Sequence, residues 1–290
     1  MSCLYISDLD GTLLTNEPRL SEFSESTLRE LLGAGLPFSV ASARSVVSMR
    51  RLLRNLPITL PVIELNGAFV SNLATGEHEI VNALDSGVAS DAYEEVLRLG
   101  HAPFVSTFNG HEDCLYVCDI ANGGMRWYLD DRIASRDPRL RSTANLGQVL
   151  SDQVVCITII NGREALVELE LVLREKCGTH VEMHLFENQY SPGWYWLTVH
   201  DWRAKKDKGV QAMMELCGLS DRSLVAFGND SNDICLFELA AERVAVANAF
   251  PELKRYATHV IGSNEDESVA RYLREHWDTV GLVAGTGDAC

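Results

Sequence analysis

The chain has 290 residues, of which 46% are hydrophobic and 23% charged, which is typical of a soluble globular protein with one large domain or two smaller ones. Its formal net charge of −16 argues against general binding to nucleic acid or to anionic membranes, since phosphate groups attract basic surfaces. No uncharged apolar run reaches membrane-spanning length, and no leader pattern precedes the first strand, which favours a cytoplasmic protein. The eight cysteines contain no C-x-x-C pair, which favours reduced core thiols over disulfides or zinc ligands.

Strands and helices alternate over the first 74 residues. The apolar run at 3–6 predicts a buried strand, and strands are also expected at 37–41 and 61–65. Apolar residues at helical spacing predict helices between them, at 21–32 and 46–55. Such alternation implies right-handed crossovers, so we expect a parallel, Rossmann-like, doubly wound α/β sheet.

The pattern changes after residue 74. The expected elements here are strands at 104–108, 115–118, 154–160, 180–186 and 194–199 and helices at 125–133 and 165–176. Their order, αββ, αβ, αββ, suits a compact α+β module with its own sheet. We therefore expect an inserted second domain over 75–202, which divides the first domain into residues 1–74 and 203–290.

The alternation resumes in the last part of the chain. The expected helices are 208–216, 234–240 and 267–277, and the expected strands are 223–227, 244–247 and 260–261. The final residues, 285–290, are small and poorly patterned, so we expect them to be loose.

Two carboxylates, Asp8 and Asp10, appear where the first strand stops, and Gly11 breaks the strand directly after them. At the carboxyl end of a strand in an open α/β sheet, such a pair lies over the crevice in which ligands bind. Two acids so close repel one another, and a hard cation such as Mg²⁺, held by oxygen ligands, would keep both ionised. The alternative is a strand end capped by an ordinary Asp turn.

Three further loops follow strands or begin helices at the same presumed edge. Ser42 and its neighbouring amides at a helix N-terminus favour an anion, although Ser42 taken alone is more simply a helix N-cap. Lys208 begins a later helix and supplies the nearest point charge. Residues 228–233, Gly-Asn-Asp-Ser-Asn-Asp, follow a strand and are rich in oxygen ligands. Together these groups predict a site for a phosphate and a magnesium ion.

The segments D-L-D-G-T-L-L, S-A-R, D-K-G and G-N-D-S-N-D-I, in this order, resemble the four motifs of the haloacid dehalogenase superfamily of phosphatases. The insert between the second and third motifs is similar, in length and element order, to the cap of the Cof-type sugar-phosphatase branch. In the core the resemblance covers roughly residues 1–74 and 202–278.

The resemblance implies a mechanism. Asp8 would attack phosphorus and become an aspartyl phosphate, while Asp10 would protonate the leaving oxygen and then deprotonate the attacking water. Mg²⁺ would neutralise Asp8 and the phosphoryl oxygens, with the backbone carbonyl of Asp10 and the fourth loop completing its ligands. Ser42 and Lys208 would hold the transferring oxygens. Further candidates for binding phosphate or substrate are Ala43, Arg44, Asn66 and Asn232.

The fourth loop departs from the family pattern. Family members usually carry Asp where this chain has Asn229, and acids follow here at Asp230 and Asp233. An Asn carbonyl can ligate Mg²⁺ but adds no charge, so either the affinity falls or Asp233 compensates. We expect Asn229 and Asp233 to be metal ligands beside Asp8 and Asp10, with Asp230 as the alternative after a small loop shift.

Several of these residues also have plain structural interpretations. Arg44 either contacts substrate or phosphate or is a solvated cation in the first turn of a helix. Lys205 and Lys206 are expected to form an ordinary surface run, because only Lys208 precedes the glycine that the motif requires. Asn66 resembles a family position near the site, but Asn-Gly is also a common turn.

The motifs together predict a Mg²⁺-dependent phosphatase that hydrolyses a small phosphorylated metabolite, with sugar phosphates favoured by the family resemblance alone. Two alternatives stay open. A phosphomutase of the same superfamily would pass the phosphoryl group to a second hydroxyl, and a non-catalytic phosphometabolite-binding or regulatory protein would bind without turnover. The sequence indicates no protein partner.

Overall fold

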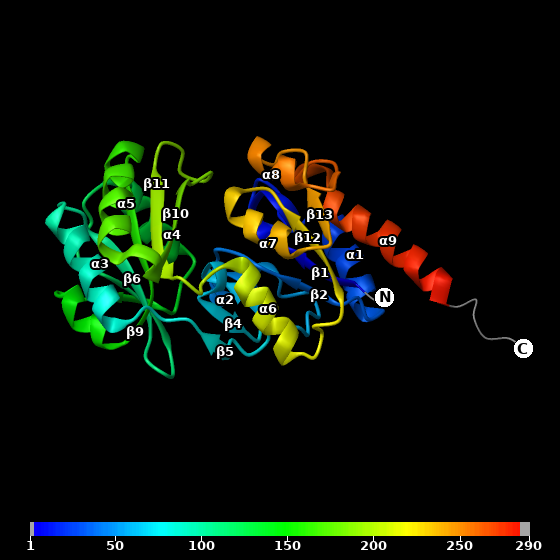
Figure 1. The fold of residues 1–290 in the computed structure, drawn as a ribbon, viewed down its shortest axis with the longest axis horizontal. Helices are drawn as coiled ribbons and strands as arrows, with labels where there is room; N and C mark the ends of the chain where they lie inside the picture. Colours follow the sequence, from blue (N-terminus) through cyan, green and yellow to red (C-terminus); the bar gives the residue numbers. More distant parts are fainter. Residues whose placement is uncertain (1–2, 285–290) are drawn as a thin grey trace, which may run out of the picture. The chain divides into compact units, whose positions relative to one another are not determined.

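The computed structural model describes residues 3–284, with side chains described for residues 3–277 (Figure 1). The expectation for residues 285–290 lies outside this range. The chain divides into two compact units, one formed by Met1–Ile80 and Lys205–Cys290 and the other by Val81–Ala204. The second unit begins later than the expected insert, because residues 78–81 form a strand that extends a small sheet of the first unit.

A five-stranded parallel sheet, in the order β14-β13-β12-β1-β2, forms the centre of the first unit. Its strands are β1 (Cys3–Ser7), β2 (Phe38–Val40), β12 (Ser223–Gly228), β13 (Glu242–Ala245) and β14 (His259–Val260). In register, Ser7 at the end of β1 lies between Val40 of β2 and Phe227 of β12. The carboxyl end of β1 is therefore flanked on both sides by the ends of neighbouring strands.

Helices cover both faces of this sheet. They are α1 (Glu22–Gly33), α2 (Val46–Leu52), α6 (Lys206–Leu216), α7 (Ile234–Leu239), α8 (Pro251–Tyr256) and α9 (Ser268–Ala284). The connections from β1 to β2 and from β12 to β13 run in opposite directions across the sheet, so right-handed crossovers put α1 and α7 on opposite faces. Helix α9 packs beside α1, and α6 packs beside α7 (Figure 1). The predicted doubly wound α/β architecture is confirmed.

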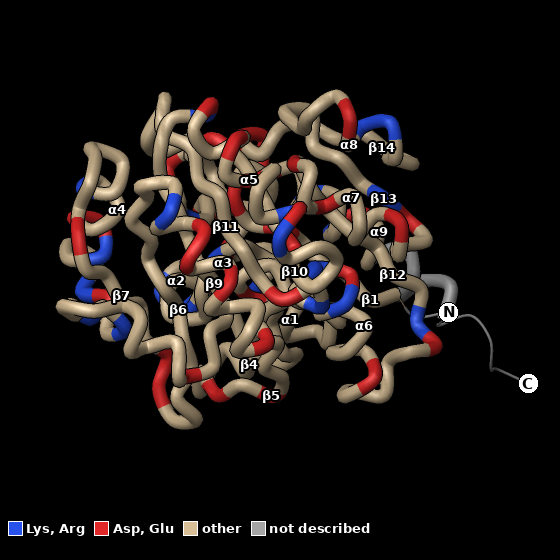
Figure 2. Tube along the Cα trace, turned by 60° about the vertical axis from the view of Figure 1, so that its left-hand side comes forward, with Lys and Arg blue, Asp and Glu red and all other residues tan. Residues whose placement is uncertain are grey.

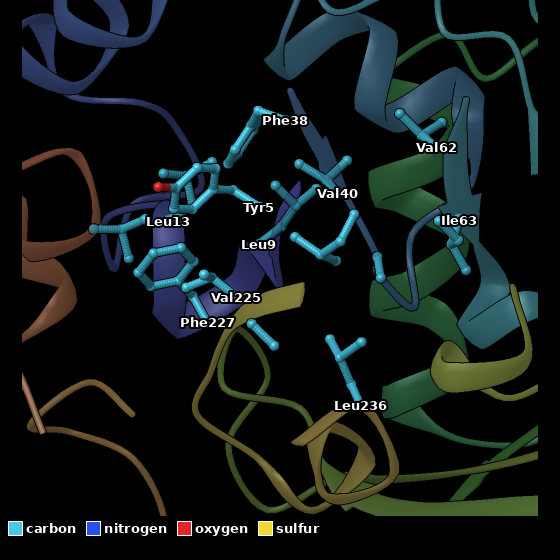
Figure 3. Close-up of a cluster of buried hydrophobic side chains, with 14 of the residues drawn as sticks. Tyr5, Leu9, Leu13, Phe38, Val40, Val62, Ile63, Val225, Phe227 and Leu236 are labelled. Atoms are coloured by element: carbon cyan, nitrogen blue, oxygen red, sulfur yellow. The ribbon is translucent and has the colours of Figure 1, made fainter. Parts of the chain in front are cut away.

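Apolar side chains from three adjacent strands and a helix fill the core of the first unit. Figure 3 shows Tyr5 of β1, Phe38 and Val40 of β2, Phe227 of β12 and Leu236 of α7, all of them buried. Burial of this apolar surface is the main force that holds the strands in register. It thereby fixes the strand ends from which the polar loops emerge.

A small antiparallel sheet continues from the edge of the parallel one. It contains β3 (Val62–Glu64), β4 (Phe69–Ser71) and β5 (His78–Val81), of which β4 and β5 were not predicted. A parallel bridge between Ala41 and Ile63 joins β3 to the end of β2. Between β3 and β4 the chain passes through three consecutive residues with positive φ: Leu65, Asn66 and Gly67.

The second unit has a six-stranded sheet of its own, in the order β10-β11-β9-β6-β7-β8. Its strands are β6 (Pro103–Phe108), β7 (Asp113–Val117), β8 (Leu140–Ser142), β9 (Gln153–Asn161), β10 (Val181–Glu187) and β11 (Tyr195–Asp201), and its helices are α3 (Ser86–Arg98), α4 (Gly123–Ala134) and α5 (Arg163–Cys177). Helices α3 and α5 cover the face that carries Val105 and Leu197, and α4 packs on the face that carries Phe104 and Trp196. Alternation along the strands thus buries both faces.

Two expectations from composition concern the whole chain. The cysteines in the described part of the chain are free thiols, as predicted, although Cys118 is exposed rather than in the core. Among the described residues, no helix combines the length and the apolar character that crossing a membrane requires.

Candidate active site

Asp8 is the first residue beyond β1. Its backbone N–H donates to the carbonyl of Phe227 over 3.0 Å, which ties it to the end of β12. A single wide turn, Leu9–Leu13, follows, and Gly11 in this turn has φ +73°. A Cβ on Gly11 would lie 2.5 Å from Nδ2 of Asn229, so a larger residue here would be strained at this φ and would displace the side chain of Asn229.

The lysine that reaches Asp8 is Lys206. Its Nζ donates to Oδ1 of Asp8 over 2.7 Å and to Oδ1 of Asp233 over 2.7 Å, and its side chain is fully buried. Lys208 is exposed, and its Nζ donates to Gln211 instead. The assignment of Lys208 to the site was therefore wrong, as was the expectation that Lys206 lies on the surface. The physical reason is that α6 begins at Lys206, two residues before the predicted start, which turns Lys206 towards the core.

Asp233 organises the fourth loop. Its Oδ2 accepts the backbone N–H groups of Asn229 over 2.9 Å and Asp230 over 3.1 Å, while its Oδ1 accepts from Lys206. These bonds use three of the four acceptor positions of the carboxylate. The side chain of Asp230 caps the following turn by accepting the N–H of Ser231 over 2.6 Å.

Burial controls the charges of this cluster. Burial raises the pKa of Asp8 to about 7, with the negative charge of Asp233 adding to the rise and the ammonium of Lys206 opposing it. Burial alone would lower the pKa of Lys206, but the charges of Asp233 and Asp8 outweigh it and raise that pKa, so the ammonium stays charged. Because the pKa of Asp8 lies near 7, a bound cation that favours the carboxylate would shift Asp8 readily to its ionised form.

Ser42 lies in a loop that is bound firmly to the neighbouring strand. Its N–H donates to the carbonyl of Ile63 over 2.9 Å, and its carbonyl accepts the N–H of Asn66 over 3.0 Å. The N-cap of α2 is Ser45, so Ser42 precedes the helix and is not its cap. Its buried hydroxyl instead accepts the N–H of Arg44 over 3.1 Å, which leaves its own O–H as a donor, and Ala43 beside it is exposed.

Asn66 and Asn232 join two of the predicted loops. The Nδ2 of Asn232 donates to Oδ1 of Asn66 over 3.0 Å. Asn66 is almost fully buried and has φ +58°, a conformation that Asn tolerates better than most residues. Through this hydrogen bond, the Asn-Gly turn links the loop after β3 to the loop after β12.

Arg44 is paired with Asp10. Its Nε donates to Oδ2 of Asp10 and its Nη2 to Oδ1, each over 2.7 Å. Its Nη1 donates to Oγ of Ser48 over 3.1 Å. Arg44 is therefore neither a solvated surface cation nor, in this arrangement, simply a phosphate ligand.

The oxygen donors around Asp8 can be compared with what Mg²⁺ requires. The candidates are the carboxylate of Asp8, the backbone carbonyl of Asp10, and the side-chain oxygens of Asn229 and Asp233. Oδ1 of Asn229 accepts the hydroxyl of Thr12 over 3.0 Å, and one acceptor position remains on Asp233. Within the described residues, no three His, Cys, Asp or Glu side chains are arranged to hold a metal. The donors fit Mg²⁺ that takes few protein ligands and keeps waters and substrate oxygens.

Comparison with known proteins agrees with this geometry. The family model for haloacid dehalogenase-like hydrolases matches residues 5–273. The chain is 21% identical over 273 residues to the 5-amino-6-(5-phospho-D-ribitylamino)uracil phosphatase YitU of Bacillus subtilis, covering 93% of this chain and 96% of the relative. It is 26% identical to the pyridoxal phosphate phosphatase YbhA of Escherichia coli, covering 93% and 96%. The crystal structure of TM0651 from Thermotoga maritima is similar with a TM-score of 0.77 and 26% identity, covering 95% of this chain and 97% of that one.

A family model that spans nearly the whole chain, together with the polar loops at the carboxyl edge of the sheet, defines the class of protein. The chain belongs to the haloacid dehalogenase-like hydrolase family. Within that family it is a phosphatase of the Cof type, a phosphoric monoester hydrolase.

Proposed function

We propose that this phosphatase hydrolyses the phosphomonoester of a small metabolite through an aspartyl phosphate formed on Asp8. The observation that carries the proposal is the fully buried ammonium of Lys206, held between Asp8 and Asp233 at the carboxyl end of β1. A cation fixed there would hold the nucleophilic carboxylate in place and offset the charge of an approaching phosphoryl group.

The steps divide between two carboxylates. Asp8 attacks phosphorus as the bond to the leaving oxygen breaks, and Asp10 gives its proton to that oxygen. Water then attacks the phosphoryl group of the aspartyl phosphate, passes a proton to Asp10 and releases the carboxylate of Asp8. The hydroxyl of Ser42 and the amide of Ala43 would donate to phosphoryl oxygens, in the role that the sequence pattern had also given to Lys208.

Magnesium would supply positive charge to the phosphoryl oxygens and to the attacking carboxylate. We propose Asp8, the backbone carbonyl of Asp10 and Asn229 as its protein ligands, with Asp233 available through one remaining position. Asp230 stays the alternative, although its side chain already caps a turn.

The substrate class is supported by the named relatives. YitU is named for a phosphorylated ribitylamino-uracil and YbhA for pyridoxal phosphate, both small molecules with one phosphate ester. We propose a substrate of this size, and the preference for a sugar phosphate remains a prediction. We further propose that the second unit, Val81–Ala204, is the inserted cap that selects among such molecules.

A screen of phosphorylated metabolites for released phosphate tests the proposal. We expect Mg²⁺-dependent release that chelation abolishes, and none above background from Asp8→Asn. Asp8→Asn is close in size to the native residue, so circular dichroism should show an unchanged fold. Isomerised sugar phosphate with little free phosphate would instead identify a phosphomutase, and ligand binding without any turnover would identify a regulatory protein. Normal turnover by Asp8→Asn would refute the nucleophile.

A further inference from the structure

The pairing of Arg44 with Asp10 has the geometry of a guanidinium fork. Two nitrogens of Arg44 each donate to a different oxygen of the Asp10 carboxyl group over 2.7 Å. Such bidentate pairs fix the direction of both partners as well as their separation. The side chains of Arg44 and Asp10 are only 16% and 29% exposed, so the fork is partly shielded from water.

Arg44 is itself held from several sides. Its carbonyl accepts the N–H of Leu65 over 3.1 Å, its N–H donates to Oγ of Ser42, and its third guanidinium nitrogen donates to Oγ of Ser48. The backbone and the far end of the side chain are therefore both fixed. A group anchored in this way can hold another side chain in one orientation.

We propose that Arg44 is the positioning residue for the acid/base carboxyl group of Asp10, and that it acts on the leaving oxygen through Asp10. The inference rests on the proposed function, because it assigns Arg44 to the step in which Asp10 gives its proton to the leaving oxygen. This role differs from both expectations for Arg44, which were contact with substrate or phosphate and a solvated cation.

The fork is compatible with proton transfer. It fixes the direction in which the two oxygens of Asp10 point, and therefore the direction from which the leaving oxygen takes the proton. When the bond from phosphorus to the leaving oxygen breaks, its electron pair goes to that oxygen, which takes the proton from Asp10. The resulting carboxylate of Asp10 keeps both bonds from Arg44, and its orientation is ready to accept a proton from water.

The nature of the leaving group separates this role from phosphate binding. A poor leaving group, such as a phenolate without electron-withdrawing groups, needs a proton from Asp10. A good one, such as dinitrophenolate, departs without it. Loss of a phosphate ligand would slow all substrates alike, whereas misplacement of the acid would slow the poor leaving groups most.

The experiment compares kcat/KM for a series of substituted phenyl phosphates in the wild type, Arg44→Ala and Arg44→Lys. We expect Arg44→Ala to lose on the order of 100-fold with phenyl phosphate and less than about threefold with dinitrophenyl phosphate. Asp10→Asn should show the same dependence on the leaving group. Arg44→Lys should fall between, because a single ammonium cannot form the fork.

Two controls accompany the series. Arg51→Ala removes an exposed arginine of α2, the helix that follows Arg44, and should leave every rate unchanged. Inhibition by inorganic phosphate should be nearly the same in the wild type and in Arg44→Ala. An equal loss across all leaving groups would overturn the inference, with weakened phosphate inhibition identifying a phosphate ligand and unchanged inhibition a merely structural residue. Absence of phosphate release from the wild type would refute the proposed function instead.

Discussion

Lys206 is a buried cation whose stability depends on its two carboxylate partners. Transfer of an ammonium group into the protein interior is costly unless opposite charges and hydrogen bonds compensate. Asp8 and Asp233 provide both. The ammonium of Lys206 in turn opposes the rise that burial causes in the pKa of Asp8, so the lysine and the acids depend on one another.

Replacement of Lys206 should therefore damage both stability and activity. In Lys206→Met, Asp8 and Asp233 would lie close together in the core without a counter-charge, which should cost about 3–5 kcal/mol in the free energy of unfolding. Phosphate release should fall to background. Lys208→Ala is the matched control, since Lys208 is exposed, and should change stability by less than about 0.5 kcal/mol. If Lys208→Ala were inactive and Lys206→Met active, the assignment would be reversed.

Asn229 should limit the affinity for magnesium. Asn229→Asp keeps an acceptor for Thr12 and adds a negative charge to the proposed ligand set, so it should strengthen Mg²⁺ binding by about 1 kcal/mol, roughly fivefold. The measurement is the Mg²⁺ concentration for half-maximal phosphate release, with direct binding by calorimetry. Asp230→Asn is the control. A strong effect of Asp230→Asn with none from Asn229→Asp would identify Asp230 as the ligand.

The sequence contained a signal for Lys206 that motif matching overlooked. Lys206 precedes Val210 by four positions and Met213 by seven, so all three lie on one face of a helix, and that face is buried. Lys208 lies on the other side of the helix. Adjacency to a glycine pointed to the wrong lysine, and helical periodicity would have pointed to the right one.

At the scale of elements, the turn after β3 determines where α6 can begin. Gly67 has φ +108°, and a Cβ there would lie 2.5 Å from the carbonyl oxygen of Lys205 and 2.8 Å from its nitrogen. Lys205 directly precedes α6, whose first residue is Lys206. The close approach of two backbone segments thus fixes the start of the helix that carries Lys206.

Gly67→Ala should therefore be more harmful than a positive φ alone explains. A side chain at positive φ lowers the free energy of unfolding by about 1–2 kcal/mol, and the contact with Lys205 should at least double this loss of stability. Gly35→Ala is the matched control, because Gly35 has φ +92° and no atom within 4 Å of its added Cβ. Denaturant unfolding measures the difference, and phosphate release should fall only in Gly67→Ala. Equal losses in both variants would show that the contact is unimportant.

In the second unit, a buried histidine should make the protein sensitive to acid. Burial lowers the pKa of His200 from 6.5 to about 4, partly offset by its hydrogen bond to the carbonyl of Val155. In the unfolded chain, the imidazole of His200 binds a proton more readily than in the folded chain. The contribution of neutral His200 to the free energy of unfolding is therefore complete above pH 6.5 and is lost as the pH falls towards 4.

The free energy of unfolding of the full chain, measured between pH 7 and pH 4, tests this effect. The contribution of His200 corresponds to a loss of roughly 3 kcal/mol at most. His200→Gln should flatten the dependence, whereas replacement of the exposed His111 by Gln should not. An unchanged slope in His200→Gln would contradict the role of burial.

At the scale of the whole molecule, acidic residues are spread over the elements of both units, as Figure 2 shows. With a net charge of −16, an anionic substrate gains nothing from the overall field. Binding of phosphate must depend on local groups instead. In the function proposed above, those groups are Lys206, the donors of the Ser42 loop and a bound Mg²⁺.

Much of the fold follows from local patterns. Short apolar runs predicted the central strands β1, β2 and β12 of the parallel sheet, because these strands are buried on both faces. Strands β4 and β5 were missed because pairing with a neighbour, rather than their own sequence, makes them strands. At the site, Asp8, Asp10 and the loop at 228–233 were predicted because they follow strands directly. The partner of Arg44 could not be predicted, because it depends on a contact between residues distant in sequence.

The most direct test of the central claim is pre-steady-state release of dinitrophenolate from dinitrophenyl phosphate by Asp10→Asn. This leaving group needs no acid, but hydrolysis of the aspartyl phosphate needs Asp10 as a base. The account predicts a burst of about one equivalent per enzyme followed by slow turnover, with a phosphoryl group on Asp8 after acid quenching. It also predicts no burst when Asp8→Asn is added. A burst that survives the loss of Asp8, or a phosphoryl group on another residue, would contradict it.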